Sequence, residues 1–147
     1  MLKLHLIKVI DFDPVIVAKD KNDHPVLMID IRFSPLYSAT DLKIEKMEEY
    51  QNVPFLMFVN SQIIKIFKTA DFKEVATLPT QEVLLYYNPE IADKMLFQSS
   101  LITLIQAWLR DLAYHWKSQE PPFIKEIQEI GLFDYLIGGS TQQLEDL

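Results

Sequence analysis

The chain contains no cysteine. Disulfide bridges, thiolate zinc sites, iron–sulfur clusters and cysteine nucleophiles are therefore excluded. Glycine is almost as scarce, because its three residues all follow position 130. A phosphate-binding loop needs glycines between a strand and a helix, so none can form in the first half of the chain. We therefore expect neither cysteine chemistry nor a glycine-rich nucleotide site.

Long apolar runs are also missing. The longest stretch without a charged residue, 95–109, is too short to span a bilayer and contains several polar side chains. The first residues carry neither an unbroken apolar run of signal-peptide length nor a small-residue cleavage site. We expect a soluble, cytoplasmic protein that does not bind a membrane.

Basic residues are few in the second half of the chain. Residues 79–147 carry 10 acidic and 4 basic side chains, whereas residues 1–78 carry 11 and 10, and the net charge is −7. Proteins that grip nucleic acid usually present a basic face, because phosphate contacts supply most of the affinity. A basic patch could form only in the first half, so nucleic-acid binding stays open.

The patterns that are present indicate a single α/β domain over residues 1–139. Apolar side chains alternate or run together in short segments bounded by polar turns, as in strands of a sheet. The first half is predicted to hold a helix at 40–51, capped by Thr40. The predicted strands are 2–9, 14–19, 25–32, 54–59 and 62–67.

The second half changes to a helical period and gives the domain a helical C-terminal half. Its predicted helices are 80–86, 91–117 and 123–130, with one or two more turns at 132–137. Residues 140–147 are predicted to be a polar, acidic tail. The predicted core stripe of the long helix is Leu101, Leu104, Ile105, Trp108, Leu112 and Trp116.

One pattern in the first predicted hairpin is typical of a functional site. Residues 13–18 read Asp-Pro-Val-Ile-Val-Ala, and a turn leads to Asp30-Ile31-Arg32 at the end of the next strand. Because side chains alternate along a strand, Asp30 and Arg32 lie on one face. The arrangement resembles the PD-(D/E)xK nuclease superfamily, and above all its small stand-alone members common in cyanobacteria. The resemblance covers roughly residues 10–68, with a weaker echo at 107–112.

The resemblance implies a restriction-endonuclease-like fold, in which a mixed sheet is flanked by helices. It also implies a Mg²⁺ site built from an acid on each of two neighbouring strands, followed by a catalytic lysine. This chain departs from that pattern, since Val15 stands at the position of the first acid and Arg32 at that of the lysine. Asp13 and Lys46 could replace them, giving Asp13 and Asp30 as metal ligands and Asp30, Arg32 and Lys46 as catalytic residues.

Two function hypotheses follow, and a plain structural domain with a chance motif is a third. The first is a nuclease-fold protein without catalysis or cofactor, which acts by binding a protein partner or by self-association. In that case Asp30 and Arg32 form an ordinary ion pair. The second is a Mg²⁺-dependent DNA endonuclease with a rearranged active site. A homo-oligomer, most simply a homodimer, is expected because the aromatic content is 12% and the helical half is apolar.

Overall fold

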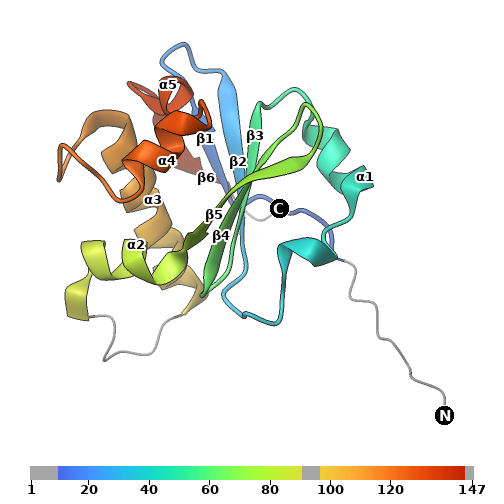
Figure 1. Ribbon diagram of the computed structural model, residues 1–147, viewed down its shortest axis with the longest axis horizontal. Coiled ribbons are helices and arrows are strands. Elements are labelled where there is room, and N and C mark those ends of the chain that lie inside the picture. The colour runs from blue at the N-terminus through green and yellow to red at the C-terminus, as the bar shows by residue number, and fades with distance from the viewer. Residues whose placement is uncertain (1–9, 91–96, 145–147) are drawn as a thin grey trace.

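A computed structural model describes residues 10–90 and 97–144, apart from the side chains of Ile44 and Lys46. Its centre is a mixed six-stranded sheet in the order β5-β4-β3-β2-β1-β6 (Figure 1). Only β2 and β3 are parallel neighbours, and the other pairs are antiparallel. The strands are β1 (Ile16–Lys19), β2 (Pro25–Ile31), β3 (Phe55–Val59), β4 (Ile63–Lys68), β5 (Lys73–Pro79) and β6 (Ser140–Gln143).

Helices cover both faces of this sheet, which confirms the α/β class. One face carries α2 to α5, and the opposite face carries α1 with two short 3₁₀ turns (Figure 1). The crossover through α1 is what allows β3 to run parallel to β2. The helical segments are η1 (Ala39–Asp41), α1 (Ile44–Met47), η2 (Glu48–Tyr50), α2 (Thr80–Tyr87), α3 (Gln98–Tyr114), α4 (Ile124–Glu129) and α5 (Phe133–Leu136).

The alternation of side chains along β3 divides the core in two. Phe55, Met57 and Val59 belong to the large core, which is shared with α3, whereas Leu56 and Phe58 belong to the small core beneath α1. All five residues of β3 are buried, as expected for a central strand that is covered on both faces. Asp30 is the register partner of Phe58 across the parallel pair.

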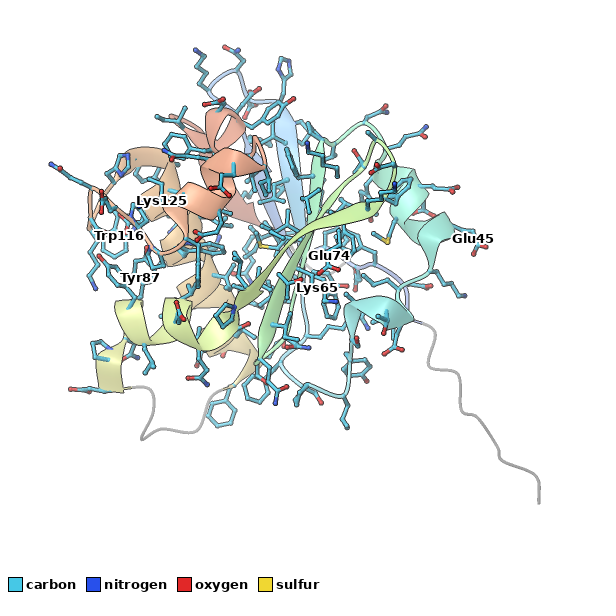
Figure 2. All side chains as sticks on the ribbon, in the orientation of Figure 1. Glu45, Lys65, Glu74, Tyr87, Trp116 and Lys125 are labelled. Atoms are coloured by element: carbon cyan, nitrogen blue, oxygen red, sulfur yellow. The ribbon has the colours of Figure 1, made fainter. Side chains whose placement is uncertain are left out.

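The long helix α3 buries most of its predicted stripe, but Trp116 is an exception. Leu101, Ile105, Trp108 and Leu112 are fully buried, whereas Trp116 is 52% exposed. The helix ends at Tyr114, because His115 adopts a left-handed conformation, and this turns Trp116 out of the stripe. Its indole Nε1 donates to the carbonyl of Ala107, and its ring lies 5.9 Å from that of Tyr87 (Figure 2).

Several predicted boundaries are wrong. The helix predicted at 40–51 is three short pieces, and its cap is Ser38 rather than Thr40, with Asp41 completing a capping box. Residues 140–143 are not tail but strand β6, which pairs with β1. Strand β5 was not predicted at all. The predicted strand at 2–9 and the first residues of the helix predicted at 91–117 lie outside the described residues.

Within the described ranges, no helix combines the length and apolar character needed to cross a membrane.

Candidate functional site

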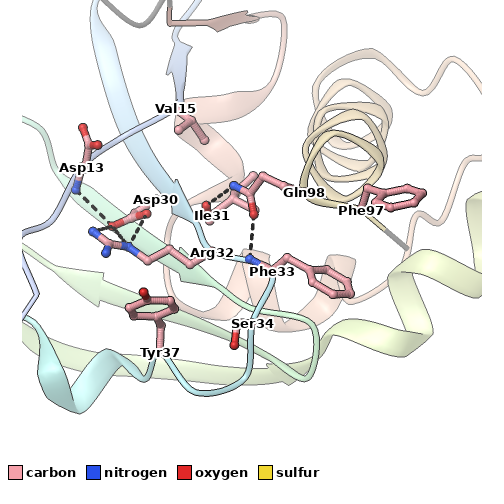
Figure 3. A pocket seen from close by; sticks show the side chains of 10 residues that line it. All are labelled: Asp13, Val15, Asp30, Ile31, Arg32, Phe33, Ser34, Tyr37, Phe97 and Gln98. Atoms are coloured by element: carbon pink, nitrogen blue, oxygen red, sulfur yellow. Dashed lines mark hydrogen bonds and ion pairs between the residues drawn. The ribbon is translucent and has the colours of Figure 1, made fainter. Parts of the chain in front are cut away.

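The candidate site is a cleft of about 610 Å³ at the point where β1 and β2 separate. The β1–β2 hairpin remains hydrogen-bonded as far as Val15, whose N–H donates to the carbonyl of Ile29 over 2.8 Å. Ile16 is the register partner of the same Ile29, so two successive residues share one partner, as in a β-bulge. Beyond this point the strands diverge, and Asp13, Asp30 and Arg32 all line the opening (Figure 3).

An ion pair forms one wall of the cleft. The Nε of Arg32 lies 3.3 Å from both carboxylate oxygens of Asp30, and Nη2 lies 3.3 Å from Oδ2. The backbone N–H of Asp13 donates to the same Oδ2 over 3.0 Å. Asp30 is only 1% exposed. The two residues that share a strand face in the sequence pattern therefore pair with each other.

Arg32 is held from other directions as well. Its Nη2 donates to the carbonyl of Asp11, and its guanidinium lies 5.5 Å from the centre of the Tyr37 ring. Its backbone N–H donates to Val59 on β3. These contacts orient the guanidinium toward Asp30, and they limit its freedom to reach a ligand.

The surroundings of Asp30 oppose its ionisation on balance. Burial raises the pKa of the Asp30 carboxyl above its ordinary value, while the Asp13 amide and the Arg32 guanidinium act in the opposite direction. The negative charge of Asp13 adds to the rise. A buried acid with a perturbed pKa in a cleft is a candidate functional group.

The other predicted site residues lie less favourably for a metal. Asp13 is exposed and approaches Asp30 with its main-chain N–H, while its carboxylate points away (Figure 3). Val15 packs against the large core and offers no side-chain oxygen. Lys46 belongs to α1, but its side chain lies outside the described part of the structure. In the described residues, no group of three or more histidine, cysteine or acidic side chains could hold a metal ion.

Gln98, the first residue of α3, is a site residue that the sequence pattern did not reveal. Its Oε1 accepts from the backbone N–H of Phe33 over 2.7 Å, and its Nε2 donates to the carbonyl of Ile31. These are the backbone groups that β2 would offer to β1 if the hairpin continued. One amide side chain thus caps the open end of the strand and ties α3 to the cleft (Figure 3).

A second buried acid lies in the helical layer, also unpredicted. Asp111 accepts hydrogen bonds from the hydroxyls of Tyr87 and Ser118, each over 2.7 Å, and from the backbone N–H groups of Lys117 and Ser118. Burial opposes its ionisation, but the hydrogen bonds from Ser118, Tyr87 and the backbone of Lys117 act in the opposite direction, and on balance the pKa of Asp111 is lowered. Asp111 ties α2 to the end of α3. The sequence carries a signal for its role, because an acid at this position interrupts the apolar stripe of the long helix.

We expect Arg32→Met to destabilise the protein by about 1–2 kcal/mol at neutral pH, because it leaves the buried Asp30 carboxylate with only the Asp13 N–H. Chemical denaturation measures the loss. Lys43→Met is the matched control, since Lys43 and Asp11 form an exposed pair at 3.8 Å and its removal should cost less than about 0.5 kcal/mol. Equal losses in the two variants would mean that the Asp30–Arg32 pair has no structural role.

No family model, curated protein or solved structure matches this chain.

Proposed function

We propose that the chain is a restriction-endonuclease-like domain that has lost catalysis and acts through protein interaction, either with a partner or with a second copy of itself. The fold part of this proposal is supported by the mixed sheet, the β1–β2 hairpin that carries Asp30 and Arg32, and helices on both faces. The compartment proposed for it is the cytoplasm.

A single observation carries the proposed loss of catalysis: Arg32 contacts both oxygens of Asp30, and the Asp13 N–H donates to one of them. Magnesium needs an octahedral set of oxygen ligands. To bind here it would have to displace a guanidinium held by Asp30, Asp11 and Tyr37. The metal would also lack the carboxylate ligand that an acid in place of Val15 would supply. An arginine that is already paired with Asp30 is a poor substitute for the lysine of the family pattern.

The alternative is a Mg²⁺-dependent DNA endonuclease with Asp13 and Asp30 as ligands and Lys46 or Arg32 facing the phosphate. One observation favours it: Asp13 and Asp30 both line the cleft, and the backbone N–H of Asp13 lies 3.0 Å from the Asp30 carboxylate. A rotated Asp13 side chain would bring a second oxygen to the cleft. The alternative requires that the Asp30–Arg32 pair opens.

A cleavage assay separates the two proposals. The full chain and Asp30→Ala are incubated with supercoiled plasmid and with single-stranded DNA, each in millimolar Mg²⁺ or Mn²⁺. We expect no cleavage by the wild type beyond the level of Asp30→Ala. Metal-dependent cleavage by the wild type that disappears in an Asp30→Ala protein that is still folded would overturn the proposed loss of catalysis, because a contaminating nuclease would cleave equally in both preparations.

A further inference from the structure

The two edges of the six-stranded sheet differ in how they are protected against pairing with another chain. An edge strand presents unpaired N–H and C=O groups, and proteins block such edges with charges, prolines and bulges. β5 has all three, because it carries Lys73 and Glu74, shifts its register against β4 and ends at Pro79. β6 reads Ser-Thr-Gln-Gln and pairs with β1 in unbroken register. Of the two edges formed by the described strands, β6 is therefore the unprotected one (Figure 1).

The backbone groups that β6 turns outward follow from its pairing with β1. The N–H of Leu144, the residue after β6, donates to the carbonyl of Val15 over 2.8 Å. Residues of an antiparallel ladder point their backbone groups alternately toward one neighbour and away from it. Leu144 and Gln142 therefore face β1, whereas Thr141 and Gln143 direct their N–H and C=O groups away from the sheet.

Exposed apolar side chains lie beside this edge. Arg110 on α3 donates from Nε to the hydroxyl of Thr141 over 3.1 Å, so this face of α3 lies against β6. Tyr114 follows one turn later on the same face of the helix and is 50% exposed. Ile137 is 45% exposed, and the N–H of the residue after it donates to the carbonyl of Ala113. The open edge thus continues into an apolar surface of the helical layer, as is typical of an interface.

We propose that β6 is a self-association edge, at which the β6 strands of two copies pair antiparallel about a twofold axis at Gln142. This axis places Thr141 of each copy opposite Gln143 of the other, so the outward backbone groups of both strands satisfy one another. A second copy is the favoured occupant because the edge is self-complementary under this axis, and because an uncharged strand keeps the net charge of −7 on each chain away from the seam. The inference rests on the interaction part of the proposed function and names the partner as a second copy.

Sedimentation equilibrium of the full chain and of two charge variants tests the pairing. We expect the wild type to form a reversible dimer. Gln142→Lys and Gln142→Glu each place two like charges opposite one another at the axis, and each alone should dimerise about fivefold more weakly than the wild type. An equimolar mixture should recover the wild-type affinity, because a lysine then faces a glutamate. Thr77→Lys and Thr77→Glu, at an exposed position of β5, are the matched controls and should dimerise like the wild type.

Three outcomes would overturn the inference: a wild type that stays monomeric up to millimolar concentration, a dimer that neither Gln142 variant weakens, or a mixture that stays as weak as its components. If a charge variant does not fold, Gln142→Cys replaces it, because the chain has no native cysteine and residues facing each other in this way lie close enough for a disulfide. We expect it to cross-link two copies on oxidation far faster than Thr77→Cys, and equal rates would contradict the pairing.

Failure of this inference is distinguishable from failure of the proposed function. A monomeric wild type removes the second copy as partner, whereas the proposed interaction with another protein would still stand. Neither readout involves metal or DNA, so the proposed loss of catalysis is tested separately by the cleavage assay.

Discussion

Asp111→Ala is expected to destabilise the protein by about 2–4 kcal/mol, because four buried or half-buried donors lose their common acceptor. Asp111 is completely buried, and the bond that it accepts from the Tyr87 hydroxyl joins α2 to α3. Urea denaturation measures the loss. Asp134→Ala, at an exposed acid on α5, is the control and should cost less than about 0.5 kcal/mol.

The effect of Asp111 should depend on pH with a defined sign. Its pKa is lowered in the folded state, so its contribution to stability is present above the unfolded pKa and is lost as the pH falls through the folded pKa. The stability difference between wild type and Asp111→Asn should therefore shrink in acid.

Asp30 has a raised pKa, so its contribution to stability is present at low pH and is lost as the pH rises through the pKa of the folded state. The stability difference between the wild type and Asp30→Asn should therefore shrink as the pH rises.

Gly139→Ala should also cost about 2–4 kcal/mol, for a steric reason. A Cβ at this position would lie 2.0 Å from the carbonyl oxygen of Lys19 and 3.1 Å from that of Leu136, and both are backbone atoms that cannot rotate away. The close approach is what lets β6 begin its pairing with β1 at Ser140 and Lys19. Thermal melting measures the loss.

Gly131→Ala is the matched control for Gly139. Gly131 has a φ of +87°, but a Cβ there would meet nothing within 4 Å. Only the strain of the left-handed conformation applies, and it costs about 1 kcal/mol. If the two variants lost the same stability, the packing of β6 against β1 would not be as tight as the structure shows.

The central strands could be predicted from the sequence because their side chains are strongly apolar and bounded by polar turns. The edge strands could not. β5 is mostly exposed and ends in Pro79, and β6 reads Ser-Thr-Gln-Gln, so neither carries a clear apolar pattern. Their positions depend on partners, since β5 pairs with β4 and β6 with β1. Edge strands are defined by tertiary pairing more than by composition.

The candidate site could be predicted only where neighbours in sequence meet in space. Asp30 and Arg32 are two residues apart on one strand, and the structure pairs them. Asp13 was placed near Asp30 by the same reasoning, but the pattern could not say that it would approach with its backbone N–H. Gln98 reaches the cleft from 65 residues beyond Phe33, a relation that no local pattern contains.

The proposed function requires that Arg32 and the Asp13 N–H close the carboxylate of Asp30 to metal. The most direct test is the melting temperature of the wild type and of Asp30→Ala, with and without millimolar Mg²⁺ or Mn²⁺. A ligand stabilises a protein only by binding its native state, so we expect neither melting temperature to rise. A rise in the wild type alone would contradict the account. It would assign Asp13 and Asp30 as ligands, with Lys46 or Arg32 as the cation that stabilises the phosphate.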